Sequence, residues 1–315
     1  MRNLVIGIVL GFVLVSGVAW ARDTPDWSWL TPLAQPAPAD GSDNMAQRHL
    51  PGSNRTFTWT QIKDLHHVAD WFPDQHPAMP NSVATGHDNA NACAYCHLPT
   101  GDGRPENYPL AGLSAAYIRE QVAAFANGTR RSAVPSALPA KFMSATATAV
   151  SADELATAAA YFSKLPYKSH VNVVETSKLG FRPAVFVYVL QPGTSQPLGD
   201  RIIEVPVDPE RFELRDPRSR FIAYVPPGSV AAGRALVASG GGARQPCAGC
   251  HGAGLRGGIA PPLAGRSPTG IMRQLAAFQT GTRASEQAAL MRAITARLST
   301  KDMIALSAYV ATLKP

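Results

Sequence analysis

The chain has 315 residues, which is enough for two domains that each bury a core. Only 16% of its residues are charged, and 26 glycines with 27 prolines indicate many loops and turns. The formal net charge is +7, and no Lys/Arg-rich run interleaved with aromatic residues indicates a nucleic-acid surface. We therefore expect a globular protein with a mild preference for acidic partners and no nucleic-acid partner.

Residues 1–21 have the pattern of a secretory signal peptide. Arg2 supplies a positive charge, an apolar run follows to Ala19, and Ala19-Trp20-Ala21 is an A-x-A cleavage site. We expect export and a mature chain that begins at Arg22; an uncleaved membrane anchor is the alternative. No later segment approaches the length of a membrane span.

All four cysteines lie in two copies of one motif. Residues 93–97 read C-A-Y-C-H and residues 247–251 read C-A-G-C-H. One helical turn with this spacing presents two thiols to the vinyl groups of a haem, and the following histidine can bind the iron. A redox thiol pair or half of a zinc site would explain one copy, but the duplication favours haem. We predict two covalently bound haem c groups, held by Cys93, Cys96, His97, Cys247, Cys250 and His251.

A longer repeat surrounds the two motifs. Each motif is followed by a P-L-A-G turn, a helix with the pattern Q-x-x-x-F-x-x-G, a segment with one methionine and a final helix that begins with a capping box. The P-L-A-G turns are residues 109–112 and 262–265, and the middle helices include residues 121–128 and 274–281. Each half therefore predicts a haem helix, a middle helix, a loop containing a methionine and a final helix.

Met143 and Met291 occupy equivalent places in the two predicted loops. A thioether there could reach the distal face of the haem, where it favours ferrous iron and raises the reduction potential. Packing in the core is the alternative role of any methionine, and we assign it to Met272 and Met303. The expected iron ligands are His97 and Met143 in the first half, and His251 and Met291 in the second.

The remaining segments differ from the two halves. Residues 22–78 form a Trp- and Pro-rich N-terminal arm, in which Thr60 to Trp71 has the spacing of one helix. Residues 166–229 contain β-branched and aromatic runs separated by Gly and Pro turns. We expect these runs to form a small antiparallel sheet or hairpins that pack against the helical halves.

Together these motifs resemble a dihaem class I cytochrome c of the two-domain c4 kind, over roughly residues 80–165 and 228–315. The resemblance implies a mainly α fold with two class I cytochrome c-type domains, residues 79–165 and 230–315, joined by the β-rich segment. It also implies that a backbone carbonyl three residues before Ala-Gly accepts a hydrogen bond from the proximal histidine. Pro261 matches the usual proline there, whereas Tyr108 departs from it.

The resemblance further implies a periplasmic electron carrier. Its partners would be a dehydrogenase or a quinol-oxidising respiratory complex on one side and a terminal acceptor such as an oxidase on the other. It would act in solution or within a membrane-associated complex. Arg130 and Arg283, at matched positions, are candidates for pairing with haem propionates, with a solvated surface position as the alternative.

Two other functions remain open. A dihaem enzyme, such as a peroxidase-like oxidoreductase, would keep one iron open or His/His-ligated, and an assembly or sensor protein would use the haems to report redox state. No distal acid, base or histidine follows either motif at matched spacing, so we predict no catalytic residue and favour the carrier. Six histidines could nevertheless reach the first haem: His49, His66, His67, His76, His87 and His170.

Overall fold

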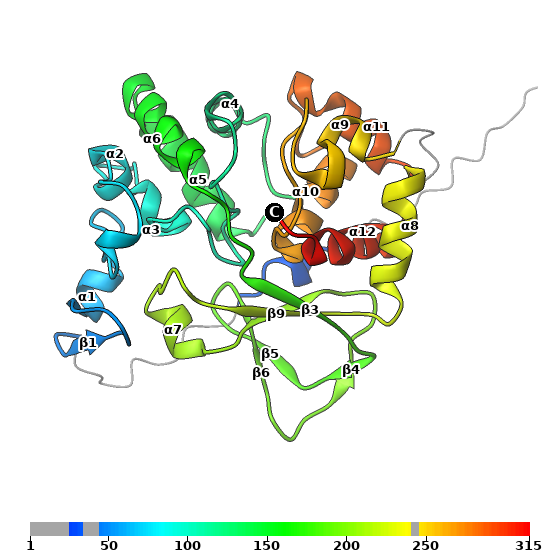
Figure 1. The fold of residues 1–315 in the computed structure, drawn as a ribbon, viewed down its shortest axis with the longest axis horizontal. Coiled ribbons are helices and arrows are strands. Elements are labelled where there is room, and N and C mark those ends of the chain that lie inside the picture. Colours follow the sequence, from blue (N-terminus) through cyan, green and yellow to red (C-terminus); the bar gives the residue numbers. More distant parts are fainter. Residues whose placement is uncertain (1–24, 34–43, 241–245) are drawn as a thin grey trace, which may run out of the picture.

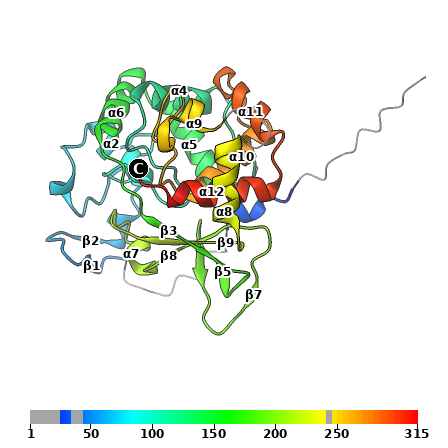
Figure 2. The same cartoon turned by 45° about the vertical axis from the view of Figure 1, so that its right-hand side comes forward.

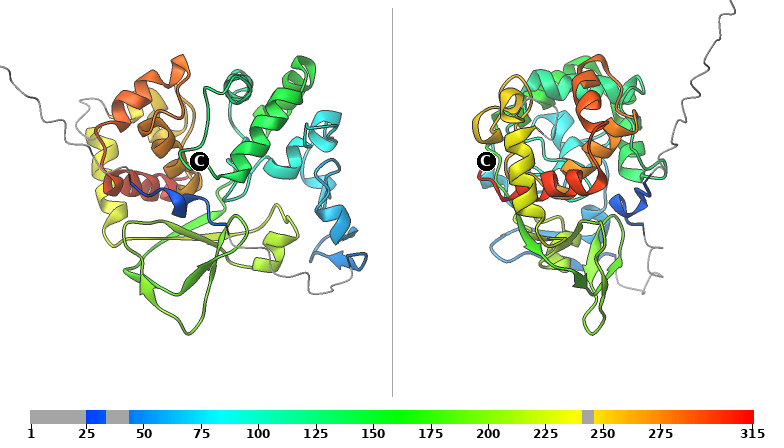
Figure 3. Two further views of the ribbon diagram at one scale, coloured as in Figure 1. Left: turned by 180° about the vertical axis from the view of Figure 1, so that it is seen from behind. Right: turned by 90° about the vertical axis from the view of Figure 1, so that its right-hand side faces the viewer.

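The computed structural model describes residues 25–33, 44–240 and 246–315. Two groups of helices stand beside each other, and a layer of strands runs beneath them (Figure 1). Two further directions show the same layering (Figure 2 and Figure 3). This architecture confirms the predicted mainly α fold with a β-rich segment between its halves. The predicted signal peptide lies outside the described residues.

The first helical group follows the predicted order of elements. Ser114 caps the middle helix α4, and Ser151 forms a capping box with Glu154 at the start of the final helix α6. These two helices pack through a core that contains Phe162. The helices are α2 (Asn81–Ala84), α3 (Cys93–His97), α4 (Ala115–Ala126), α5 (Leu138–Ala149) and α6 (Ala152–Lys164).

The second helical group repeats this order. Ser267 caps α10, and Ser299 forms a capping box with Asp302 at α12. Helix α8 crosses α12 closely at Gly233. A Cβ at this position would collide with the carbonyl of Ala305, so the close crossing requires glycine. The helices are α8 (Ser229–Ser239), α9 (Ala248–His251), α10 (Pro268–Gln279), α11 (Ala289–Thr295) and α12 (Thr300–Thr312), with 3-10 turns η3 (Ala253–Leu255) and η4 (Glu286–Ala288).

The β-rich segment differs in part from its prediction. Its main sheet has the strand order β3-β9-β8, in which β3 and β9 are parallel and only β8 and β9 are antiparallel. The parallel pair arises because the chain leaves β3 through two small antiparallel ladders and α7 before it returns as β9. These elements are β3 (Val171–Glu175), β4 (Lys178–Leu179), β5 (Phe181–Pro183), β6 (Tyr188–Leu190), β7 (Gln196–Pro197), β8 (Ile203–Pro206), α7 (Pro209–Glu213) and β9 (Phe221–Val225).

The main sheet packs against the second helical group. Phe221, Ala223 and Val225 of β9 belong to the same buried cluster as Met272 of α10 and Met303 of α12. Both methionines are 0% exposed, as their predicted core role requires. The β-rich segment, residues 166–229, is called the connecting segment below. It is therefore part of the core of the second half rather than a flexible linker.

The N-terminal arm contacts the second half and the β-rich segment. Leu30 is buried in the core of the second group, and Trp71 donates a 2.7 Å hydrogen bond to the carbonyl of Leu214 beyond α7. The predicted helix from Thr60 to Trp71 is wrong beyond Ile62, because the Asp64 carboxylate accepts hydrogen bonds from the backbone amides of the next turn. The elements are η1 (Ser28–Leu30), β1 (Gln47–His49), β2 (Thr56–Thr58), α1 (Trp59–Ile62) and η2 (Pro73–Gln75).

Glu204 ties the main sheet to the start of α10. Its carboxylate is buried and accepts a 2.6 Å hydrogen bond from the Ser267 hydroxyl and a 3.3 Å bond from the Thr269 amide. Burial raises the pKa of Glu204 above its usual 4.5, although the hydrogen bonds from Ser267 and Thr269 oppose the change. The folded chain therefore binds this proton more tightly than the unfolded chain.

The raised pKa of Glu204 predicts a pH dependence of stability. Binding of this proton contributes to the free energy of unfolding. The contribution is fully present below pH 4.5, the usual pKa of the carboxyl group in the unfolded chain. It is lost as the pH rises through the higher pKa of the folded state. We expect the free energy of unfolding to fall more steeply with rising pH in the unsubstituted protein than in Glu204→Gln. Urea unfolding from about pH 4 to about pH 8 measures both slopes. Parallel curves for the two proteins would contradict this prediction.

Candidate haem-binding sites

Both C-x-x-C-H motifs form the short helix that haem attachment requires. The first is α3, and in the second Cys247 precedes α9. None of the four cysteines forms a disulfide, so each thiol is available for a thioether bond. Burial raises the pKa of Cys93 to about 12, with a smaller contribution from Cys96. These residues fit two covalently attached haem groups.

The two histidines predicted as proximal ligands are oriented in the same way in both halves. Nδ1 of His97 lies 2.9 Å from the carbonyl oxygen of Tyr108, and Nδ1 of His251 lies 2.8 Å from that of Pro261. Because a carbonyl can only accept, Nδ1 is the donor and Nε2 remains free to bind iron. Burial lowers the pKa of His97 to about 4 and also lowers the pKa of His251, which keeps both rings neutral for ligation.

Tyr108 makes the same hydrogen bond as the proline it replaces. The acceptor is a backbone carbonyl, so the side chain does not decide whether the bond forms. The Tyr108 ring instead packs against the cores of both halves, and its centroid lies 5.4 Å from the Arg266 guanidinium. Its departure from the family pattern thus affects packing between the halves.

The structure corrects the predicted loop position of the two methionines. Met143 lies within α5 and Met291 within α11. Residues 138–149 contain no glycine, and their one proline stands in the first turn, where a helix tolerates it. Met143 lines a cavity together with Cys93. Met291 and Cys247 pack against one buried cluster.

The histidines considered as alternative ligands have other partners in several cases. His87 lines the cavity of Met143, but its Nε2 lies 2.9 Å from the Glu154 carboxylate. His76 contacts the Asp70 carboxylate at 3.2 Å and the Tyr161 hydroxyl at 3.1 Å. Further carboxylate contacts are His67 with Asp64, His87 with Asp88 and His170 with Asp102.

Arg130 and Arg283 meet where the two halves join. The Gln121 side-chain oxygen accepts hydrogen bonds from both guanidiniums, at 2.8 and 2.7 Å, and the Gln274 oxygen accepts one from each at 3.0 Å. Backbone hydrogen bonds from Arg131 to Thr282 and from Ala284 to Thr129 close the junction. The arrangement is symmetric, as expected when equivalent residues of a repeat face each other.

This junction carries unbalanced positive charge. Within the described residues, no carboxylate lies at ion-pair distance from Arg130 or Arg283. Burial and, to a smaller extent, the neighbouring Arg283 lower the pKa of Arg130 to about 9. Arg283 is buried, so the alternative of a solvated surface arginine is wrong for this residue. A buried and a half-buried cation without a carboxylate partner are chemically suited to an anionic group.

Sequence analysis missed Arg266, which is 1% exposed and joins the two P-L-A-G turns. Its guanidinium donates hydrogen bonds of 2.9 and 3.0 Å to the carbonyls of Pro109 and Ala111 in the first half, and one of 2.9 Å to Pro262. The repeat did contain a signal, because Leu113 follows the first P-L-A-G turn where Arg266 follows the second.

Comparison with known proteins decides the family. A family model described as cytochrome c matches residues 230–314. The chain is 38% identical over 96 residues to cytochrome c-554(547) of Halothiobacillus neapolitanus. This alignment covers 28% of this chain and 99% of that protein. The chain belongs to the cytochrome c family. Its two motifs and these similarities make it a dihaem, c4-like electron-transfer cytochrome with two covalently bound haem c groups.

Other relatives match both halves of this cytochrome. It is 28% identical over 238 residues to the "Thiosulfate dehydrogenase electron acceptor" of Thiomonas intermedia (strain K12), covering 74% of this chain and 84% of that one. It is 26% identical over 233 residues to cytochrome c4 of Pseudomonas aeruginosa, covering 72% and 87%. A structure of thiosulfate dehydrogenase (TsdBA) from Marichromatium purpuratum aligns with a TM-score of 0.46 and 29% identity, over 71% of this chain and 36% of that one.

The described part of this cytochrome contains no helix that is both long enough and apolar enough to cross a membrane.

Proposed function

We propose that this cytochrome is a periplasmic carrier with two His/Met haems, which passes electrons from a dehydrogenase or a quinol-oxidising complex to a terminal acceptor. Its haem domains would span residues 79–165 and 230–315. The matched geometry of His97 and His251 is the main support, since both rings present a free Nε2. The thioether residues would be Cys93, Cys96, Cys247 and Cys250, and the distal ligands Met143 and Met291.

The partner proposal rests on the relatives and on the N-terminus. A relative that matches both halves is named as the electron acceptor of a thiosulfate dehydrogenase, which supports an enzyme of the dehydrogenase class as donor. The signal-peptide pattern of residues 1–21 supports export, as does c-type haem, whose attachment takes place outside the cytoplasm. A thiosulfate dehydrogenase is therefore the first donor to test.

The haems would supply one-electron exchange at iron, and the chain sets the conditions for it. The two histidines bind without a change in protonation, because their rings are already neutral and oriented. The guanidiniums of Arg130 and Arg283 would neutralise haem propionates at the junction. Anionic groups there would be held by both halves together, which favours transfer between the two haems.

The absorption spectrum of the purified oxidised protein tests this function. A far-red charge-transfer band of the strength expected for two Met-ligated ferric haems, with no spectral change when carbon monoxide is added to the reduced protein, is the expected result. A half-strength band with carbon monoxide binding would contradict the carrier with two closed irons. It would favour the dihaem enzyme. The observation that supports this alternative is that His87 lines the same cavity as Met143.

A further inference from the structure

The two haem motifs differ sharply in how far the chain covers them. Ala94, inside the first motif, is 1% exposed, whereas its counterpart Ala248 is exposed. The Arg215 guanidinium lies 3.6 Å from the centroid of the Tyr95 ring and donates a 2.7 Å hydrogen bond to the Tyr95 carbonyl. The counterpart of Tyr95 is Gly249, which is exposed.

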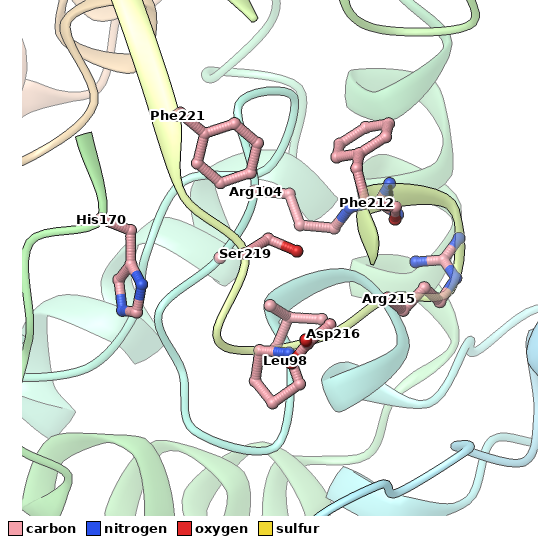
Figure 4. A pocket seen from close by; sticks show the side chains of 10 residues that line it. Leu98, Arg104, His170, Phe212, Arg215, Asp216, Ser219 and Phe221 are labelled. Carbon is pink, nitrogen blue, oxygen red and sulfur yellow. Dashed lines mark hydrogen bonds between the residues drawn. The ribbon is translucent and has the colours of Figure 1, made fainter. Parts of the chain in front are cut away.

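The cover of the first motif is built by the connecting segment. Arg104, in the loop after this motif, lies 4.0 Å from the Phe212 ring centroid and donates a 3.1 Å hydrogen bond to the Phe212 carbonyl. Figure 4 shows Phe212, Arg215 and Ser219 facing Leu98 and Arg104 around a small pocket. Helix α7 and the loop after it therefore occupy the surface that a partner would need beside the first haem.

The corresponding surface of the second motif is open and apolar. Ile259 is 90% exposed, and its loop is attached to the motif by a 3.0 Å hydrogen bond from the Ala260 amide to the Cys250 carbonyl. Ile259 thus lies directly beside a cysteine expected to hold the edge of the second haem. We call this surface the Ile259 patch; its exposed members are Ala248, Gly249, Ala253, Gly254, Gly258 and Ile259.

The sequence around the Ile259 patch is strongly cationic. No acidic residue occurs between Asp216 and Glu286, although this stretch contains Arg218, Arg220, Arg234, Arg244, Arg256, Arg266, Arg273 and Arg283. Arg256 is exposed in the loop that leads to Ile259, and its Nε lies 3.3 Å from the carbonyl of Lys314 near the C-terminus. An apolar centre beside the exposed Arg256, in a stretch of sequence without acidic side chains, is complementary to an acidic partner with an apolar contact surface.

We infer that an acidic redox protein docks on the Ile259 patch and exchanges electrons with the second haem, while the connecting segment closes the first motif to such partners. This inference rests on the proposed carrier function. Electron transfer slows steeply with the distance between redox centres, so the covered first haem exchanges with partners through the second. The connecting segment thereby makes the two similar halves unequal.

The test uses the full-length dihaem protein and reduced plant-type [2Fe–2S] ferredoxin, chosen as an acidic redox protein with a low potential. Stopped-flow absorption gives the second-order rate of haem reduction. Ile259→Asp removes the apolar centre and repels an acidic partner, so we expect the rate to fall by at least about ten-fold. Ile259→Ser removes only the apolar contact and should give a smaller decrease. Added salt should slow the unsubstituted protein.

Val207→Asp is the matched control, because Val207 is a 58% exposed aliphatic residue of the connecting segment. Its rate should equal that of the unsubstituted protein. Equal rates in Ile259→Asp and the unsubstituted protein, or a slower rate in Val207→Asp than in Ile259→Asp, would overturn the docking site. Electrode voltammetry separates this failure from failure of the proposed function: two reversible one-electron waves keep the carrier function intact, and their absence rejects it.

Discussion

Met291→Ala should leave both haems attached while the second iron loses its distal ligand. The thioether bonds and His251 do not involve this side chain, so the haem stain on a denaturing gel is expected to be unchanged. Loss of a soft sulfur ligand should lower the potential of one haem by on the order of 100 mV, within the range of ~0.8 V that axial ligands can set. The far-red charge-transfer band should fall to half its strength, and the reduced protein should bind carbon monoxide. Met143→Ala should have the same effect on the first haem.

Met303→Ala is the control for this prediction. Met303 is 0% exposed in the core of the second half, so its truncation should reduce the free energy of unfolding by about 2–5 kcal/mol and leave the charge-transfer band intact. A spectrum and carbon monoxide response unchanged by Met291→Ala would show that this residue is not a ligand. The comparison is informative because the structure places Met291 in a helix, where packing is the usual role of methionine.

Arg266→Met should weaken the contact between the two halves. The substitution keeps an apolar stem but leaves the carbonyls of Pro109, Ala111 and Pro262 without their donor. It also removes the cation that lies 4.5 Å from the Tyr167 ring centroid. Because each buried unsatisfied carbonyl costs about 1–3 kcal/mol, we expect a loss of about 3 kcal/mol or more in the free energy of unfolding. The two halves should then unfold in separate transitions.

Urea unfolding of the haem-loaded protein, followed by absorption and by circular dichroism, measures this effect. Arg220→Met is the control, since Arg220 is exposed and should tolerate the change. If Arg266→Met and Arg220→Met had the same midpoint and a single transition, Arg266 would not join the halves. The test also bears on the haems, because the Arg130–Arg283 junction lies between the same two halves.

Sequence analysis predicted the local features well. The capping boxes at Ser151 and Ser299 form as expected, because a cap and its partner are three residues apart. The predicted helix beyond Ile62 was wrong, since Asp64 offered the backbone a competing set of hydrogen bonds. The methionine segments were predicted as loops, yet their composition favours helix and both are helical.

The sequence by itself determined the cofactor of this cytochrome, because the C-x-x-C-H pattern that indicates covalent haem lies within five consecutive positions. It also revealed the duplication, which pairs each residue of one half with its counterpart in the other. Only the tertiary structure decided how the halves are joined and which motif is covered. Arg266 reaches Pro109 across 157 positions of sequence, and Arg215 reaches Tyr95 across 120. Contacts between such distant residues depend on the packing of the whole chain and leave no periodic pattern in the sequence.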